Sequence, residues 1–235
     1  MTDILILRHT DYCAPGHLAE VLRAGGHAFT QVRVDLGQLA AVDLDQPKAV
    51  AILGGGMSVN DPLPWLEPEV VAIQHFLQRD IPIIGHCLGG QLLAKALGAE
   101  VHAMAYQEVG WQTLEKTACA LVSPWLEHVP AEFELFQWHG DTFALPPGAQ
   151  HLLRNGWCEN QAFAWGDKVL ALQSHPEMTV ELVEQWLSEA GYLLDERQAS
   201  QQSIAFMRTN LAARIASLNQ VAEGFYRHWL RLAFA

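Results

Sequence analysis

The sequence has few positive charges and no long apolar run. Its 235 residues include 14 Lys plus Arg against 26 Asp plus Glu, which gives a formal net charge of −12. Nucleic-acid binding is therefore not expected, because phosphate binding requires clustered positive charge and no basic stripe is present. No apolar run approaches the length of a membrane span. The N-terminal MTDILILRHTDY also lacks the basic start and the small-residue cleavage site of a signal peptide.

Cysteines are few, and their spacing predicts no disulfide framework. Cys13, Cys87, Cys119 and Cys158 form no CxxC pair. We therefore expect free thiols in a reducing, cytoplasmic setting. Internal repeats, low-complexity tracts and linkers rich in Pro, Gly or Ser are also absent. One domain over residues 1–235 is expected, with a core at 1–191 and a C-terminal helical segment at 192–235.

The first hundred residues alternate between apolar strands and amphipathic helices. Apolar runs predict strands, and apolar residues at helical spacing predict helices. This alternation predicts an α/β fold, an open parallel sheet with helices on both faces. Ligands in such sheets bind beyond the carboxyl ends of the strands, which here are His9, Gly54 to Gly56, and His86–Cys87. The predicted strands are 3–9, 29–34, 49–53 and 81–85, and the predicted helices are 15–27, 65–80 and 91–97.

The pattern changes after residue 100. Short apolar stretches separated by Pro and Gly predict further strands, several of them pairing antiparallel. TVELVEQWLSEAG, at 179–191, predicts a helix. The segment from about 198 to 232 has helical apolar spacing without an internal Pro, so it is expected to be a C-terminal helix. Its expected use is open: it could cap the core, form a dimer or dock a partner.

Cys87 lies in IPIIGHCLGGQLLAKALGA, residues 81–99, between a predicted strand and a predicted helix. A side chain on a sharp strand-to-helix turn is exposed at the top of the sheet, and the glycines Gly89 and Gly90 allow neighbouring backbone to come close. The helix N-terminus favours a thiolate and supplies N–H groups for an oxyanion. The alternative is that Cys87 is a small apolar residue of the core, which we expect for the other three thiols.

A nucleophilic thiol needs a base, and the base needs an orienting group. KVLALQSHPEM is an apolar strand that ends at His175, with Glu177 two residues later. If this strand neighbours the strand that ends at Gly85, His175 reaches Cys87 and Glu177 can hold its far ring nitrogen. A satisfied histidine at a helix start is the alternative. A metal pair is also conceivable, but no third ligand is evident, so we expect no metal.

These motifs resemble the class I glutamine amidotransferase family. The family pattern G-x-C-x-G-x-Q is matched at Gly85, Cys87, Gly89 and Gln91, and is preceded by GGG near residue 55. WHGD at 138–141 and HPE at 175–177 follow in the family's order. The resemblance spans roughly residues 1–190. The sequence is similar above all to stand-alone GMP-synthetase-like amidotransferases, and the resemblance implies a flavodoxin-like, mostly parallel sheet.

The resemblance also implies roles for individual residues. Cys87 would attack the side-chain amide of glutamine, His175 would act as base and then acid, and Glu177 would orient His175. The products would be glutamate and ammonia, the ammonia passing to a synthase subunit or another acceptor. No cofactor is required. The backbone N–H groups of Gly55 and Leu88 would hold the oxyanion, and substrate would be placed by Gln91 and by the turn Trp138–His139–Gly140–Asp141.

Two departures from the family pattern stand out. Ser174 precedes His175 where the family commonly has an aromatic residue, so the packing beside the base is open. GMP synthetases carry a nucleotide-binding synthetase part after the amidotransferase domain. No P-loop and no adenylating motif is found in this sequence.

Three alternative functions are therefore weighed against a glutaminase. The first is a γ-glutamyl hydrolase or peptidase that uses the same triad. The second is an α/β-hydrolase, for which GHCLG fits the G-x-nucleophile-x-G spacing, although the acid there precedes the His. The third is a non-catalytic binding protein that keeps the fold.

Overall fold

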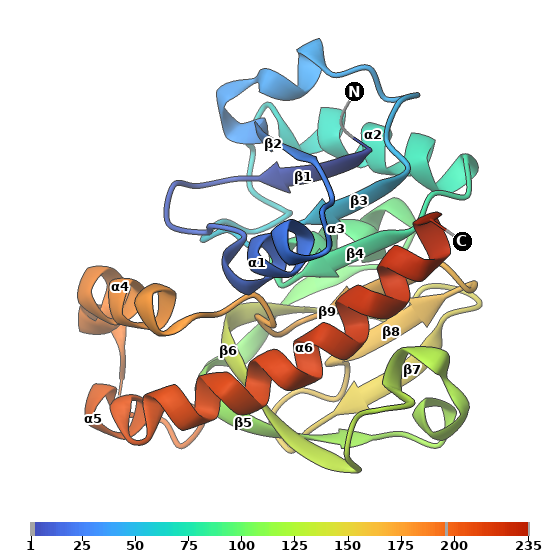
Figure 1. Ribbon diagram of the computed structural model, residues 1–235. Coiled ribbons are helices and arrows are strands. Elements are labelled where there is room, and N and C mark those ends of the chain that lie inside the picture. The colour runs from blue at the N-terminus through green and yellow to red at the C-terminus, as the bar shows by residue number, and fades with distance from the viewer. Residues whose placement is uncertain (1–2, 196, 235) are drawn as a thin grey trace.

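The computed structural model describes residues 3–195 and 197–234. Its strands form one nine-stranded sheet in the order β2-β1-β3-β4-β9-β8-β7-β5-β6 (Figure 1). The strands are β1 (Ile4–Arg8), β2 (Phe29–Arg33), β3 (Ala49–Ile52), β4 (Ile83–His86), β5 (Val101–Lys116), β6 (Glu132–Phe143), β7 (Gln150–Arg154), β8 (Ala162–Trp165) and β9 (Val169–Leu172). The α-helices are α1 (Gly16–Ala24), α2 (Leu66–Gln78), α3 (Leu88–Ala96), α4 (Val180–Ala190), α5 (Ile204–Arg208) and α6 (Leu211–Phe234), and short 3-10 helices occur at Val34–Leu36, Gln38–Ala41, Cys119–Val122, Pro124–Leu126 and Gly191–Leu193.

The sheet has a parallel half and an antiparallel half. Strands β2, β1, β3, β4 and β9 are parallel neighbours. From β9 onward, β8, β7, β5 and β6 pair antiparallel. The predicted α/β class with extra antiparallel strands in the second half is confirmed. So is the predicted pairing of the strand before His175 with the strand before Cys87, because β9 lies beside β4.

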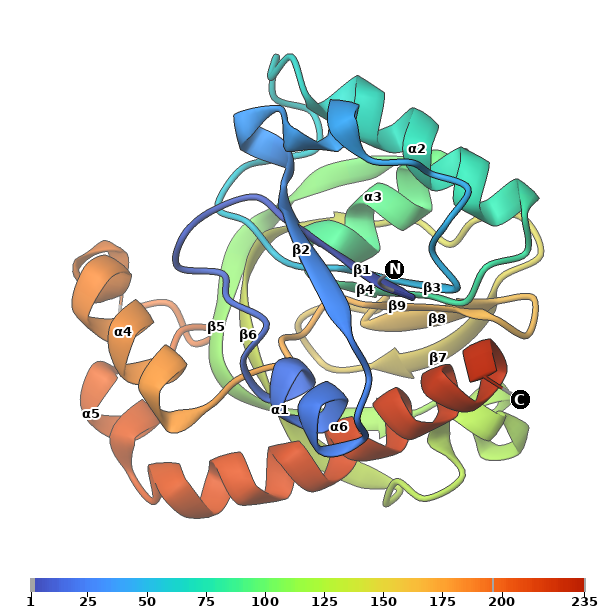
Figure 2. The ribbon, with the colours of Figure 1, turned by 45° about the horizontal axis from the view of Figure 1, so that its top comes forward.

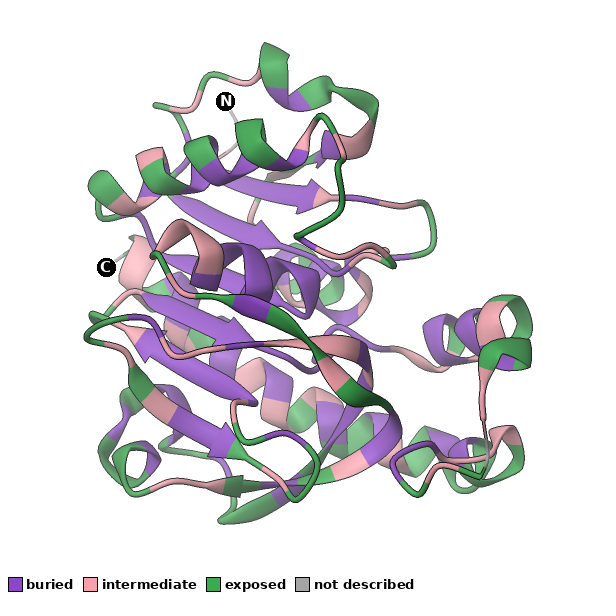
Figure 3. Ribbon diagram, turned by 180° about the vertical axis from the view of Figure 1, so that it is seen from behind, coloured by how far each residue is buried: buried purple, intermediate pink, exposed green. Residues whose placement is uncertain are grey.

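Both faces of the parallel half are covered, which explains why its strands are continuously apolar. Alternate residues of a strand point to opposite faces. Ile4 and Ile6 of β1 therefore pack into a core with α1 and α6, whereas Leu5 and Leu7 pack into a second core with α2 and α3. Figure 2 shows these helix pairs on opposite sides of the sheet, and Figure 3 shows the central strands almost wholly buried.

The C-terminal segment caps the core. Helix α6 packs on the same face as α1, and its Trp229 is fully buried, with Nε1–H donating to the carbonyl of Pro82 over 3.0 Å. Sequence spacing predicts one continuous helix here, and that prediction is wrong. Asn210 adopts a left-handed φ of 54°, which separates α5 from α6. The preceding Ser203 caps α5 by accepting a hydrogen bond from the Phe206 amide.

Two further boundaries differ from the predicted ones, and both affect the site. Helix α3 begins at Leu88, directly after Cys87, so Gly89 and Gly90 lie in its first turn and do not precede it. The WHGD sequence is not a turn: residues 138–141 lie inside β6. Strand β5 has a register shift between Ala103 and Glu108 opposite this segment, which distorts the local pairing. None of the described helices has the length and apolar character needed to cross a bilayer.

Candidate active site

Cys87 occupies a strained turn between β4 and α3. Its φ of 50° and ψ of −108° are unusual for a residue with a side chain. Two backbone hydrogen bonds hold it: its N–H donates to the carbonyl of Leu172 over 2.8 Å, and its carbonyl accepts from the Gln91 amide over 3.0 Å. A side chain at position 89 would collide with the carbonyl of Ile52, so glycine is required there. The predicted close approach of backbone at the glycines is therefore confirmed.

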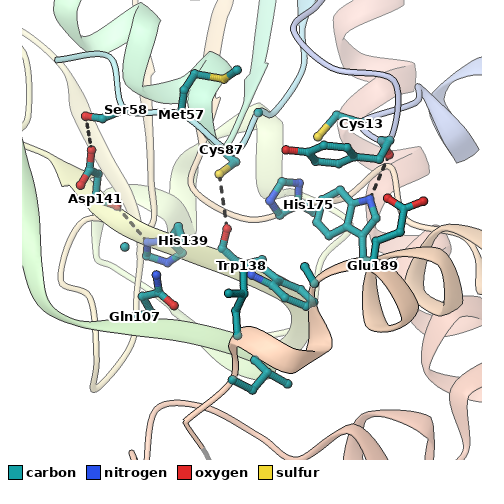
Figure 4. A pocket seen from close by; sticks show the side chains of 18 of the residues that line it. Cys13, Met57, Ser58, Cys87, Gln107, Trp138, His139, Asp141, His175 and Glu189 are labelled. Carbon is teal, nitrogen blue, oxygen red and sulfur yellow. Dashed lines mark hydrogen bonds between the residues drawn. The ribbon is translucent and has the colours of Figure 1, made fainter. Parts of the chain in front are cut away.

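His175 and Glu177 reach Cys87 because β9 pairs with β4. The segment after β9 is fixed by a hydrogen bond from the His175 amide to the carbonyl of Phe136, 2.9 Å long. The His175 ring lies beside the Cys87 thiol (Figure 4). Its Nδ1–H donates to Glu177 Oε1 over 2.8 Å, because a carboxylate can only accept. Within the described chain, Nε2 of His175 has no hydrogen-bond partner.

Glu177 lies between two histidines. Its Oε2 is 2.9 Å from Nδ1 of His86, and both side chains are almost completely buried. Burial alone would raise the pKa of Glu177, but the neighbouring His175 and His86 outweigh burial and hold this pKa well below its ordinary value. Burial alone would likewise lower the pKa of His175, yet the negative charges of Cys87 and Glu177 raise it above its ordinary value. The arrangement therefore favours the protonated, imidazolium form of His175 and the ionised form of Glu177.

The aromatic partner of His175 comes from helix α4. Trp186 packs edge-on against the His175 ring, with ring centroids 4.7 Å apart, and its Nε1–H donates to the carbonyl of Tyr12 over 2.9 Å. Ser174 is fully buried and makes no such ring contact. The sequence did not indicate which aromatic residue packs beside His175. The structure places Trp186 there, eleven positions after His175, and no local motif indicates this contact.

The predicted oxyanion groups belong to residues close to Cys87: Leu88 follows it in the chain, and Gly55 lines the same cleft. Leu88 is the first residue of α3, where an N–H has no intrahelical acceptor. Gly55 lies in the segment that follows β3, and β3 is the strand next to β4. Neither amide donates a hydrogen bond to any described residue. Two N–H groups are therefore available near Cys87, and their assignment as oxyanion donors stays a prediction.

Gln91 and Asp141 are joined in the structure. Gln91 Nε2 donates to the carbonyl of Asp141 and to Oε1 of Gln173, each over 3.2 Å. Gln173 Nε2 lies 3.7 Å from Cys87 Sγ, and the sulfur lies 3.8 Å from the carbonyl of Trp138. The Ser58 hydroxyl donates to the Asp141 carboxylate over 2.5 Å (Figure 4). Gln173 was not predicted, since one amide at the end of a strand carries no signal.

His139 belongs to a buried polar network, and both of its ring nitrogens contact acceptors within the protein. Nδ1 donates to the carbonyl of Asp141 and Nε2 contacts Glu108 Oε2, each over 2.9 Å. Asn155 and Gln161 also donate to the Glu108 carboxylate. This network fixes the conformation of residues 138–141 within β6.

One cluster has the composition of a metal site. Potential ligand atoms of Glu108, His139 and Cys158 lie within 4.8 Å of one another. Hydrogen bonds within the protein already account for Glu108 and His139, and burial raises the pKa of Cys158 to about 11, so it is a thiol. Burial also raises the pKa of Cys13 to about 12. The prediction of a buried thiol holds for Cys13 and Cys158 but is wrong for Cys119, which is exposed.

A cleft of about 760 Å³ opens over Cys87. Ser58, His139 and Asp141 form a polar part of its lining (Figure 4). Trp186, which contacts the rings of both His175 and Tyr12, brings an aromatic part to the lining next to His175. The cleft brings most of the predicted site residues together: Gly55, Cys87, Gln91, Trp138, Gly140, Asp141 and His175 all line it. Its volume lies within the range of small-molecule sites.

Comparison with known proteins gives consistent matches. The family model for "Glutamine amidotransferase class-I" matches residues 16–190. A glutamine amidotransferase-like protein of Salmonella typhimurium is 26% identical over 97% of this chain and 95% of its own length. GMP synthase of Thermomicrobium roseum is 35% identical over 56% of this chain, but the match covers only 24% of that protein. A crystal structure of a glutamine amidotransferase from Methylobacillus flagellatus superposes with a TM-score of 0.93 at 35% identity, covering 99% of this chain and 95% of the other.

Proposed function

The chain belongs to the class I glutamine amidotransferase family, and from this premise we propose that it hydrolyses the side-chain amide of glutamine through Cys87, His175 and Glu177. The observation that carries the proposal is that Glu177 holds His175 by a buried hydrogen bond, while the His175 ring lies beside the Cys87 thiol in a cleft. The family match removes the α/β-hydrolase alternative.

The proposed reaction has two halves. The Cys87 thiolate attacks the side-chain carbonyl carbon of glutamine, and the oxygen of the tetrahedral intermediate accepts hydrogen bonds from the Gly55 and Leu88 amides. As the intermediate collapses, the C–N bond breaks, His175 protonates the leaving nitrogen, and ammonia departs from a γ-glutamyl thioester. Water, deprotonated by His175, then attacks the thioester, which releases glutamate and restores the thiol.

The polar side of the cleft is suited to the amino-acid end of glutamine. Gln91 holds the Asp141 backbone, Ser58 holds the Asp141 carboxylate, and the Glu108–His139 pair supports the strand from behind. Asp141 can pair with the substrate ammonium group, and the backbone of Trp138 and Gly140, which are half-buried and line the cleft, supplies polar groups. We place Gln91, Trp138, Gly140 and Asp141 in substrate binding on these grounds.

The acceptor of the ammonia is proposed only by class. A synthase subunit is supported by the relationship to GMP synthase, where the matched region is a minor part of a longer protein. The four thiols are free, and the proposed nucleophile requires a reduced sulfur. A reducing compartment such as the cytoplasm is therefore the proposed location.

A γ-glutamyl hydrolase is a second candidate, favoured by one observation. The cleft continues past His175, where the leaving amine would depart, to the aromatic side chains of Tyr12, Trp186 and the exposed Tyr192. Ammonia alone would not fill this space. An amine bearing an apolar substituent would.

The test is glutamate release from purified protein offered L-glutamine or a γ-glutamyl peptide. We expect turnover that Cys87→Ala abolishes and Cys119→Ala leaves intact, because Cys119 is exposed and lies outside the cleft. Much faster turnover of the peptide would select the second candidate. Activity that survives Cys87→Ala, or no activity with either compound, alone or with a synthase, would contradict the proposal.

A further inference from the structure

We propose that a second buried pair, His9–Glu69, positions the oxyanion hole by fixing the peptide plane between Gly54 and Gly55. The inference rests on the proposed function, because it assigns these residues a part in stabilising the same intermediate. Neither His9 nor Glu69 reaches the cleft, so they act through the backbone and are positioning residues.

His9 has both ring nitrogens occupied by acceptors. Nε2 lies 2.9 Å from Oε1 and 3.0 Å from Oε2 of Glu69, and Nδ1 lies 3.1 Å from the carbonyl oxygen of Gly54. A carbonyl and a carboxylate can only accept, so both nitrogens must carry hydrogen and the ring is an imidazolium. Trp65 stacks on this ring with centroids 5.4 Å apart, which fixes its plane.

The sheet order determines where the other end of that peptide points. In a trans peptide the C=O and N–H groups point in opposite directions. Strand β3 lies between β1 and β4, and His9 follows β1 whereas Cys87 follows β4. Because the Gly54 carbonyl points toward His9, on the β1 side, the Gly55 N–H points toward the β4 side, where the thiol lies.

The surrounding contacts agree with this direction. A Cβ built on Gly54 would lie 3.6 Å from Cys87 Cβ and 2.8 Å from His175 Cε1, so the Gly54–Gly55 peptide adjoins both reacting groups. A Cβ built on Gly55 would lie 2.8 Å from the Leu88 side chain, next to the second predicted donor. The Gly55 amide itself has no acceptor among the described residues.

Glycine makes such a lock necessary. A Gly-Gly peptide can rotate between several backbone conformations with little steric resistance, so an unrestrained Gly54–Gly55 plane would present its N–H to the thiol only part of the time. The imidazolium hydrogen bond selects one orientation. Because the donor is charged, it also polarises the peptide and strengthens the N–H at its other end.

The ion pair is not explained by a contribution to the stability of the fold. Both side chains are completely buried, and a buried ion pair is seldom more stabilising than apolar residues of the same volume. Burial alone would lower the pKa of His9, but the charge of Glu69 and the hydrogen bonds that His9 donates to Glu69 and to the Gly54 carbonyl raise it above its ordinary value, with a smaller contribution from Asp35. The surroundings of His9 therefore favour its imidazolium form.

The test compares four variants. His9→Leu removes the donor to Gly54, and His9→Asn restores a donor that can reach the Gly54 carbonyl without the ion pair. Glu69→Gln keeps an acceptor for Nε2 but removes the charge. Glu67→Gln is the matched control, since Glu67 is exposed on the same helix α2, two residues away.

Three quantities are measured for each variant: kcat and KM for glutamine, and the rate of Cys87 alkylation by iodoacetamide. Alkylation needs the thiolate but no oxyanion hole. We expect kcat to fall about 10- to 100-fold in His9→Leu, in line with the effect of weakening one oxyanion donor. KM and the alkylation rate should stay within about twofold of wild type, because neither depends on the oxyanion. His9→Asn should recover much of kcat, Glu69→Gln should be intermediate, and Glu67→Gln should match wild type.

An unchanged kcat in His9→Leu would overturn the proposal, as would a parallel fall of kcat and alkylation rate, which indicates general damage. If His9→Leu does not fold, His9→Asn and Glu69→Gln are judged by the same three quantities. If wild-type protein hydrolyses no glutamine, the proposed function fails separately. Crystal structures of wild type, His9→Leu and His9→Asn then decide the positioning role: a turned Gly54–Gly55 peptide in His9→Leu that is restored in His9→Asn supports it, and an unchanged peptide in His9→Leu overturns it.

Discussion

His175 and His9 lie at the ends of two strands of the parallel half, and each contacts a buried glutamate. The two regions differ in one ring nitrogen. His175 donates from Nδ1 to Glu177, and its Nε2 has no hydrogen-bond partner among the described residues, whereas His9 donates from both nitrogens, to Glu69 and to the Gly54 carbonyl. A histidine with a free nitrogen can accept and return a proton, and one with both nitrogens bonded can only hold its neighbours in place.

His139 follows the second pattern. Its nitrogens contact Glu108 and the Asp141 carbonyl, so it holds the backbone of residues 139–141 as His9 holds the Gly54 carbonyl. His9, His139 and His175 each contact a buried glutamate, and the partner of the second ring nitrogen distinguishes the three. Residue type and burial alone do not.

The same substitution at both histidines should give the largest contrast. His175→Asn removes the proton carrier, and we expect kcat to fall on the order of 10⁴-fold or more, as when a triad base is deleted. His9→Asn keeps the donor to Gly54 and should lose far less. Steady-state kinetics of the two variants measures the contrast. Similar losses in both would show that free and occupied nitrogens do not have the different duties assigned here.

A smaller effect, visible in the pH profile, is expected for Glu177→Gln. Burial lowers the pKa of His175, and the Cys87 and Glu177 charges raise it. Without the Glu177 carboxylate the pKa of His175 should fall, so the imidazolium that would protonate the leaving nitrogen is lost at lower pH. The alkaline limb of kcat/KM should therefore move toward neutral pH, together with a drop in rate. An alkaline limb that stays in place would mean that Glu177 does not set this pKa.

Much of the fold could be predicted because the parallel half follows simple physical rules. Its strands are buried on both faces and read as apolar runs, and its helices have one apolar face, as at Leu18 and Leu22. The helix boundaries were less predictable. The break between α5 and α6 depends on the single backbone conformation of Asn210, which the apolar spacing does not encode.

The candidate site was predictable where its residues are adjacent in sequence. The turn at Cys87 and the short His175–Glu177 segment each carry a local pattern, and the parallel pairing of β4 with β9 joins them. Contacts that depend on distant elements were not predictable. Trp186 reaches His175 from α4, and Glu69 reaches His9 from α2, sixty residues away along the chain.

The WHGD segment was expected to form a turn, and it lies inside strand β6. Gly and Asp next to each other favour a turn, and the sequence offers no reason to prefer a strand. The long β5–β6 pairing overrides that local preference, while Glu108 and Gln91 hold His139 and the Asp141 backbone from both sides. Tertiary hydrogen bonds therefore decide the conformation here.

The most direct test of the account is to trap the covalent intermediate. Protein mixed with glutamine is quenched in acid within the first turnover, digested with pepsin and analysed by mass spectrometry. The account predicts a γ-glutamyl thioester on the peptide that contains Cys87 and on no other, with less of it in His175→Asn. Glutamate formation without modification of Cys87, or modification of the exposed Cys119 in its place, would contradict it.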